Sequence, residues 1–168
     1  ALIIIFFSKP VSGWHFVIGV CIAFVGIAVR SWAAGYVHGK TFITTAGPYA
    51  YVRHPLYTGS FLIGFGLCLM VTNINALMST LVMWVLFAGY FFSLYRSKIM
   101  HEEKLMRRQF KSEYDVYVQA VPAYIPFKKP SSKGTGTVSL DQWIRHREYL
   151  AVVLFIIALI RLISVLEQ

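Results

Sequence analysis

Residues 47–59 read GPYAYVRHPLYTG, and they lead directly into an apolar run, FLIGFGLCLMV, at residues 61–71. Arg53 and His54 therefore stand at the beginning of a segment suited to lipid. Pro55 disfavours helical backbone at His54, and the Gly47–Pro48 dipeptide favours a turn upstream. Irregular backbone near a membrane is tolerated only where protein buries it or where it lines a cavity. The stretch therefore predicts a pocket where a membrane helix begins.

The start of that helix, near Tyr57, offers free N–H groups and the positive end of the helix dipole, which favour a carboxylate. A second interpretation of the same stretch is an interfacial anchor. Tyr49, Tyr51 and Tyr57 would then belong to an aromatic belt, and Arg53 would bind lipid phosphate. These residues alone leave both interpretations open.

The composition indicates a membrane protein. Of the 168 residues, 57% are hydrophobic and only 14% are charged, whereas soluble domains are about a quarter charged. A membrane helix needs about 20 mostly apolar residues. Four segments supply the cores of such helices: Trp14–Val29, Tyr57–Val71, Ala76–Tyr95 and Leu150–Val165. A fifth, Ala1–Phe7, is short and is interpreted as the end of a trimmed helix or a processed N-terminus.

The net charge of +9 is unevenly distributed along the chain. Basic residues concentrate in the Arg30–Leu56 and Arg96–Arg147 segments, and the Thr72–Asn75 turn between the two intervening helices has none. The positive-inside rule makes both basic segments cytoplasmic. Attraction to anionic membrane lipids accounts for the charge, and no basic–aromatic motif indicates nucleic-acid binding.

The C-terminal half predicts an amphipathic helix over roughly Glu102–Val121. Its apolar stripe consists of Met106, Phe110, Tyr114, Tyr117 and Val121. A linker rich in Pro, Ser and Gly follows at residues 128–139. We expect one integral membrane domain over 1–168, with residues 145–168 as an accessory C-terminal membrane helix. The overall fold is predicted to be all-α, a polytopic bundle of four to five membrane helices with a cytoplasm-facing cofactor pocket.

A second polar cluster lies at the end of the helix that returns from the hairpin. It contains Arg96, Lys98, His101, Glu102 and Glu103. Both clusters fall at the same end of one hairpin, so they are expected to face each other. An acid near the membrane boundary is costly without a partner. A solvated Lys98–Glu102 pair on the helix surface is the alternative interpretation.

The two cysteines, Cys21 and Cys68, lie within apolar segments and are interpreted as small buried hydrophobic residues. No CxxC or HExxH pattern is present, so no metal is predicted. No GxGxxG motif indicates a Rossmann site. An imidazole, tyrosines, a helix N-terminus and an acid together suit S-adenosyl-L-methionine, which carries an aromatic base, a carboxylate and an ammonium.

The residues at 41–126 resemble the isoprenylcysteine carboxyl methyltransferase family, whose broader relatives include phospholipid N-methyltransferases. The resemblance rests on Gly-x-Tyr, Arg-His-Pro-x-Tyr-x-Gly, Glu-Glu-x-Leu, Phe-x-x-x-Tyr-x-x-Tyr and Val-Pro-x-x-x-Pro, in this order and spacing. It implies a cytoplasm-facing pocket for S-adenosyl-L-methionine. The cofactor contacts that it implies are Thr41, Phe42, Ile43, Thr44, Tyr49, His54, Pro55, Leu56, Tyr57 and Glu102.

The resemblance also implies where the substrate is positioned. Eukaryotic members carry an Arg four residues before the cofactor-binding Glu, and that Arg is linked to substrate. Here the position is Lys98, and Arg96 lies half a turn away. An ammonium lacks the planar fork of a guanidinium. The presence of Lys instead of Arg at position 98 therefore affects the assignment of the substrate and not that of the cofactor.

The expected activity is methyl transfer to a lipid-like substrate, with the carboxylate of a prenylated cysteine-type molecule as the leading acceptor. A carboxylate needs no general base because it is already ionised near neutral pH. An amine acceptor, as in phospholipid N-methylation, would need His101 or Glu103 as a base. A nicotinamide-dependent sterol-type reductase and a non-enzymatic lipid-binding protein are the remaining alternatives. Expected partners are the lipid-like substrate and membrane lipids, and the oligomeric state is left open.

Overall fold

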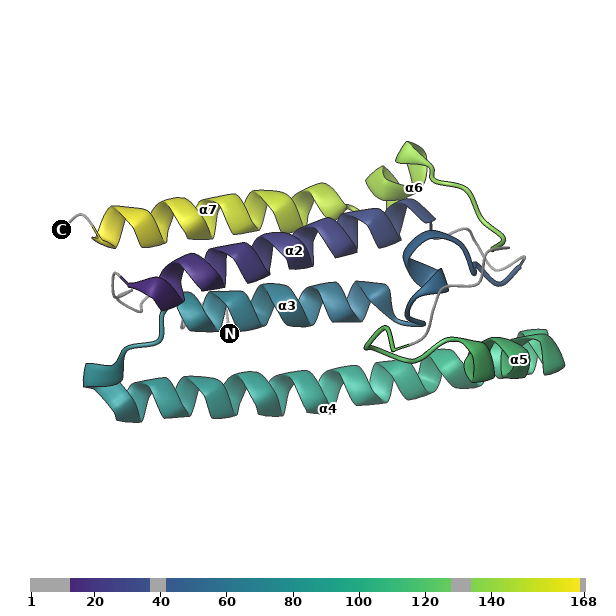
Figure 1. The fold of residues 1–168 in the computed structure, drawn as a ribbon, viewed down its shortest axis with the longest axis horizontal. Helices are drawn as coiled ribbons and strands as arrows, with labels where there is room; N and C mark the ends of the chain where they lie inside the picture. The colour runs from purple at the N-terminus through teal and green to yellow at the C-terminus, as the bar shows by residue number, and fades with distance from the viewer. Residues whose placement is uncertain (1–12, 37–41, 128–133, 167–168) are drawn as a thin grey trace.

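The computed structural model describes residues 13–36, 42–127 and 134–166, and within these ranges every regular element is a helix (Figure 1). The long elements are α2 (Trp14–Tyr36), α3 (Pro55–Met70), α4 (Leu77–Phe110) and α7 (Glu148–Leu166). The shorter ones are the 3₁₀ helices η1 (Gly47–Ala50) and η2 (Ile74–Ala76), with α5 (Ser112–Ala120) and α6 (Leu140–Arg145). The prediction of an all-α fold is confirmed for the described residues.

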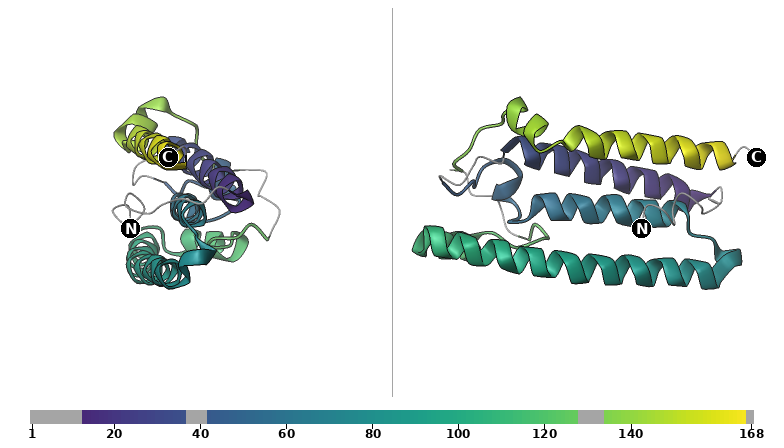
Figure 2. Two further views of the ribbon diagram at one scale, coloured as in Figure 1. Left: turned by 90° about the vertical axis from the view of Figure 1, so that its left-hand side faces the viewer. Right: turned by 180° about the vertical axis from the view of Figure 1, so that it is seen from behind.

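The four long helices run side by side along one common direction (Figures 1 and 2). Three of the described helices are long and apolar enough to cross a membrane: Trp14–Tyr36, Ile74–Phe110 and Glu148–Val165. The apolar helix α3 is shorter, at 16 residues. All four predicted apolar segments are thus helical, and the number of four to five spans stays a prediction. Ala1–Phe7 lies outside the described residues.

Helices α2 and α3 approach each other through glycines. A Cβ atom added to Gly19 would lie 2.6 Å from the carbonyl oxygen of Gly66, and one on Gly26 would lie 2.7 Å from that of Gly59. Such distances leave no room for any side chain. Small residues at helix crossings let backbones pack closely in lipid, where apolar burial supplies little driving force. The glycines therefore determine how close the two helices lie.

The main apolar cluster joins three of the long helices to α7. Leu67 and Met70 of α3, Phe87 of α4, and Phe155 and Leu162 of α7 are all buried within it. Aromatic rings line the seam between α3 and α4, where Phe61 and Phe91 have centroids 4.8 Å apart. The C-terminal helix, predicted as an accessory, thus contributes side chains to the same core as the hairpin.

The prediction of one amphipathic helix over Glu102–Val121 is wrong. Helix α4 continues to Phe110, and the chain breaks at Lys111, whose φ of 46° and ψ of −121° are not helical. A separate helix, α5, then begins at Ser112. The break reverses the chain so that Tyr114, Tyr117 and Val121 pack in a second buried cluster with Ile43. A straight helix would carry these side chains away from the rest of the protein.

Most connections between the helices lie at one end of the bundle. The C-terminal ends of α2 and α4 lie there with η1, α5, α6 and the start of α7, whereas η2 lies at the other end (Figures 1 and 2). The described parts of both basic segments identified in the sequence therefore meet at a single end. The candidate site lies at this end.

Candidate functional site

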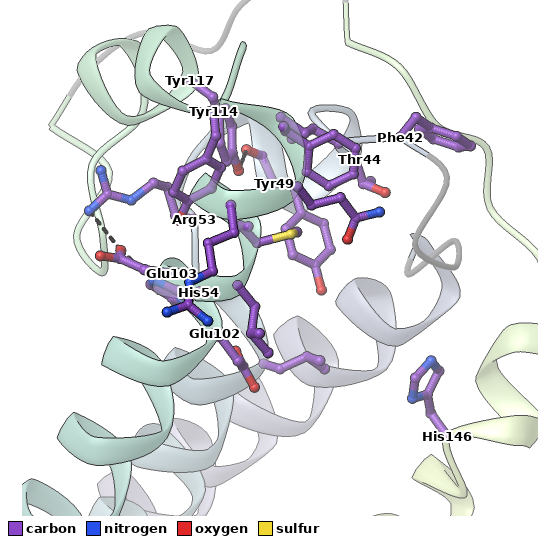
Figure 3. A pocket seen from close by; sticks show the side chains of 17 residues that line it. Phe42, Thr44, Tyr49, Arg53, His54, Glu102, Glu103, Tyr114, Tyr117 and His146 are labelled. Carbon is purple, nitrogen blue, oxygen red and sulfur yellow. Dashed lines mark hydrogen bonds and ion pairs between the residues drawn. The ribbon is translucent and has the colours of Figure 1, made fainter. Parts of the chain in front are cut away.

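A pocket of about 800 Å³ lies where η1, the start of α3, the end of α4 and α5 meet (Figure 3). Its lining is largely apolar, with a few converging charged and polar groups, which is typical of small-molecule sites. It is lined by Phe42, Ile43, Thr44, Tyr49, Arg53, His54, Leu56, Glu102, Glu103, Leu105, Met106, Arg108, Gln109, Phe110, Tyr114, Tyr117 and His146.

Hydrogen bonds from the segment after α5 hold the irregular backbone before α3. The N–H of Arg53 donates to the carbonyl of Pro122 at 2.9 Å, and that of His54 donates to Ala123 at 3.1 Å. Pro55 is fully buried and begins the helix. Because the backbone groups are paired by protein, the non-helical stretch is stable at the end of a membrane-type helix.

The 3₁₀ turn η1 is fixed on two sides. Gly47 has a φ of 57°, and a Cβ there would lie 2.7 Å from the ring of Tyr36, so both backbone and space require glycine. On the other side, the hydroxyl of Tyr117 donates to the carbonyl of Tyr49 at 2.8 Å. Helix α5 therefore holds in place the turn that carries Tyr49 into the pocket.

Glu103 connects α4 to the Arg53–His54 stretch. Its Oε1 lies 3.0 Å from Nε2 of His54 and 3.1 Å from a terminal nitrogen of Arg53. Arg53 also donates from Nη1 to the carbonyl of Val118 in α5 at 3.0 Å. The side chains of Arg53 and His54 are only 13% and 8% exposed, so the carboxylate compensates a guanidinium that water reaches poorly and gives the buried imidazole a hydrogen-bond partner.

Glu102, the neighbouring acid, has a different partner. The hydroxyl of Tyr57, in the first turn of α3, donates to Oε1 of Glu102. That bond uses one carboxylate oxygen and leaves the other open toward the pocket that Glu102 lines. The two adjacent acids thus have separate roles, because Glu103 is bound to both Arg53 and His54 while Glu102 retains capacity for a ligand.

The tyrosines of the site remain protonated at neutral pH. Burial raises the pKa of Tyr49 far above its ordinary value, and the nearby phenol of Tyr117 and carboxyl of Glu102 raise it further. Burial, with Glu103 nearby, also raises the pKa of Tyr114 to about 12. Each phenol therefore keeps a hydrogen to donate, and Figure 3 shows the hydroxyl of Tyr49 directed into the pocket.

Most of the residues predicted to contact a cofactor meet at this pocket. Phe42, Ile43, Thr44, Tyr49, His54, Leu56 and Glu102 line it. Pro55 is fully buried and is not among the lining residues, and Tyr57 contacts the lining residue Glu102. Thr41 lies outside the described residues. Arg96 and Lys98, predicted to position the substrate, are exposed on α4 and are not among the lining residues, and neither is His101.

Several lining residues were not predicted as site residues. Met106, Phe110, Tyr114 and Tyr117 were identified only as members of an apolar stripe. Met106 and Phe110 line the pocket from the end of α4, and the chain reversal at Lys111 brings Tyr114 and Tyr117 of α5 to it. No pattern in the sequence marks His146 as a site residue, because it follows a linker and a six-residue helix. No group of three or more His, Cys, Asp or Glu suited to a metal ion occurs among the residues described.

The fold and the pocket define an α-helical, membrane-type protein with a ligand site at one end of its helices. Residues 16–108, more than half of the chain, match the sequence profile of the isoprenylcysteine carboxyl methyltransferase family, and the chain belongs to that family. The matched residues cover most of α2, all of α3 and nearly all of α4. The family resemblance noted in the sequence is thereby confirmed.

Curated relatives include proteins of two kinds. The chain is 33% identical to the nickel-cobalt-cadmium resistance protein NccN of Alcaligenes xylosoxydans xylosoxydans, over 65% of this chain and 47% of that protein. It is 31% identical to the cobalt-zinc-cadmium resistance protein CzcN of Cupriavidus metallidurans, over 77% of this chain and 56% of that protein. It is 34% identical to the protein-S-isoprenylcysteine O-methyltransferase of Schizosaccharomyces pombe, over 50% of this chain and 33% of that protein.

The matched part of the chain spans about half or less of the length of these relatives. No solved structure matches the chain significantly.

Proposed function

We propose that the protein is a membrane methyltransferase that uses S-adenosyl-L-methionine and methylates the carboxylate of a lipid-like acceptor, with a prenylated cysteine-type molecule as the leading candidate. The observation that carries the proposal is the meeting of Tyr49, His54 and Glu102 in one pocket, in a chain of this family. These residues come from two sequence segments, one before α3 and one near the end of α4, that lie together in the fold.

The pocket residues suit the charges of the cofactor. Glu102, oriented by Tyr57, offers a carboxylate oxygen to an ammonium group. The beginning of α3 presents N–H groups that favour a carboxylate. Tyr49, held protonated, has a hydroxyl hydrogen to donate to the cofactor, and the apolar lining covers the remainder. The cofactor, when bound, supplies an activated methyl group on a sulfonium.

The proposed acceptor enters from the membrane. A prenyl tail is costly to expose to water, so it stays in lipid while the head group reaches the end of the bundle. Its carboxylate is already ionised and needs no base. The protein then contributes orientation and exclusion of water. Arg96 and Lys98, both exposed on α4, are proposed to attract the anionic head group.

Amine methylation is the second candidate, and the geometry supports it less. It requires a base, for which His101 and Glu103 were the candidates. His101 does not line the pocket, and Glu103 is bound to both Arg53 and His54. Both partners contact Oε1 of Glu103, so this carboxylate is already engaged within the protein.

The substrate is tested by the chemistry of the product. Purified protein is incubated with methyl-labelled cofactor and, in separate arms, with a short prenylcysteine or phosphatidylethanolamine. A methyl ester releases volatile label as methanol in alkali, and we expect this only in the prenylcysteine arm. Glu102→Gln is the low-affinity control, and an Arg96/Lys98 double alanine variant tests the attraction of the head group. Base-stable label on phosphatidylethanolamine would overturn the carboxylate assignment.

We propose that the site faces the cytoplasm, because the basic segments gather at its end of the bundle. Single cysteines at Asn75 and Glu113, both exposed and at opposite ends, test this in a variant without Cys21 and Cys68. A membrane-impermeant thiol reagent added outside intact cells should label position 75 and not position 113. The reverse pattern would invert the topology.

A further inference from the structure

His146 is a pocket residue that lies beyond the part of the chain matched by the family. It caps the C-terminal end of α6, whereas the family match ends at residue 108. Figure 3 shows its imidazole directed toward the pocket from the α6–α7 side, across from His54, Glu102 and Glu103. One wall of the pocket is therefore supplied by a segment that the family profile does not include.

Hydrogen bonds and an ion pair attach the segment that carries His146 to the core at three places. Before α6, the N–H of Thr135 donates to Oγ1 of Thr45 at 2.9 Å. At the start of α6, the N–H of Ser139 donates to the carbonyl of Gly35 at 2.8 Å. These bonds attach the segment to the pocket-lining loop and to the end of α2.

The third attachment is an ion pair made by the residue two positions after His146. Glu148, only 3% exposed, accepts from Nε and Nη2 of Arg30 at 2.7 and 2.9 Å. Arg30 also donates to Ser60 of α3. A bidentate pair fixes geometry as well as distance. His146 is thus held between two attachments to the last turns of α2, so its position is set before any ligand arrives.

The side chain of His146 is available for a ligand. It makes no hydrogen bond or ion pair with any residue that the structure describes. By contrast, His54 and Arg53 bind Glu103, and Glu102 binds Tyr57. An imidazole has at least one N–H to donate, whether neutral or protonated.

We propose that His146 binds the carboxylate head group of the methyl acceptor and thereby determines which acceptor the protein takes. The inference rests on the proposed function and deepens it. The residues expected to bind the cofactor, Tyr49, His54 and Glu102, belong to the opposite side of the pocket. A pocket of about 800 Å³ lies toward the upper end of the range of about 300–1,000 Å³ for small-molecule sites, which leaves room for a second head group.

The test compares His146→Ala and His146→Asn with the neighbouring control Arg145→Ala. Arg145 is 72% exposed, pairs with Asp141 and does not line the pocket. Binding of a short prenylcysteine and of its uncharged carboxamide is measured in detergent, without turnover. We expect His146→Ala to weaken prenylcysteine binding about tenfold through loss of a charge-assisted hydrogen bond. Binding of the carboxamide and of S-adenosyl-L-methionine should be unchanged.

His146→Asn keeps a donor and should restore part of the prenylcysteine affinity, while Arg145→Ala should match the original protein. Equal losses for prenylcysteine and carboxamide, or a loss of cofactor affinity, would overturn the proposal. The two proposals fail separately. If no acceptor is methylated but prenylcysteine binding depends on His146, only the proposed function fails. If prenylcysteine is methylated with an unchanged KM in His146→Ala, only the role of His146 fails.

Discussion

The imidazole Nε2 of His54 and Oε1 of Glu103 lie 3.0 Å apart, although 49 positions separate the two residues. The contact joins the start of α3 to α4 near the end of the hairpin that the two helices form. Since Arg53 binds the same oxygen, Glu103 holds two neighbouring residues in place. This arrangement assigns a structural role to Glu103 and leaves its neighbour Glu102 for a ligand.

Glu102→Gln and Glu103→Gln should therefore differ in effect. Loss of the Glu102 charge should weaken cofactor binding by about 1.5–3 kcal/mol, because a charge-assisted bond to an ammonium is removed. Glu103→Gln should mainly lower thermal stability, since Arg53 remains largely buried without its counter-charge and His54 loses its carboxylate partner. Calorimetric titration with S-adenosyl-L-methionine and thermal unfolding in detergent measure the two effects. Unchanged cofactor affinity in Glu102→Gln would show that the site is assigned wrongly.

Tyr57→Phe should reduce cofactor affinity less than Glu102→Gln does. The substitution removes the hydroxyl that orients Glu102 and keeps the ring, whose centroid lies 5.0 Å from that of Tyr95. The net loss of one hydrogen bond is about 0.5–1.5 kcal/mol. The same calorimetric titration measures this loss of cofactor affinity. In the Glu102→Gln background the added effect should be smaller, and full additivity would argue against coupling of the two residues.

Gly66→Ala should destabilise the protein, and Gly89→Ala should not. A Cβ at Gly66 would lie 2.5 Å from the carbonyl oxygen of Gly19 and 2.7 Å from the backbone N of Ala23, so α2 and α3 would have to separate. Overpacking of this kind costs about 1–3 kcal/mol. At Gly89, in α4, no atom lies within 4 Å of the added Cβ, and alanine favours helix. Thermal unfolding of both variants in the same detergent checks the contrast, and equal stabilities would refute the proposed close contact.

Glu148→Gln should lower stability, whereas Asp141→Asn should leave it nearly unchanged. Glu148 is buried and bidentate to Arg30, whose side chain is 29% exposed, so loss of the charge should cost about 1–3 kcal/mol. Asp141 forms a pair with Arg145 in which both side chains are mostly exposed, and such pairs contribute about 0–1 kcal/mol. Thermal unfolding of the two variants measures this difference in stability. Similar stabilities for the two variants would mean that Glu148 does not fasten α7 to the core.

The sequence by itself determined the helical segments and the location of the main site residues. Hydropathy and helix-breaking residues act locally, so the apolar segment before residue 71 and the irregular stretch at Arg53, His54 and Pro55 were readable without the fold. The expectation that this stretch faces Glu102 and Glu103 also followed from sequence, because a short turn makes the two helices a hairpin. The sequence could not assign different partners to the two acids.

Only the tertiary structure decided how the pocket is closed. The apolar spacing from Met106 to Val121 suits one continuous helix, yet the side chains can reach Ile43 only if the chain reverses at Lys111. Burial of Tyr114 and Tyr117 against a distant segment outweighs the local preference for helix, and no local pattern reports such a contact. His146 enters the pocket for the same kind of reason, because the buried pair of Arg30 and Glu148 joins helices that are remote in sequence.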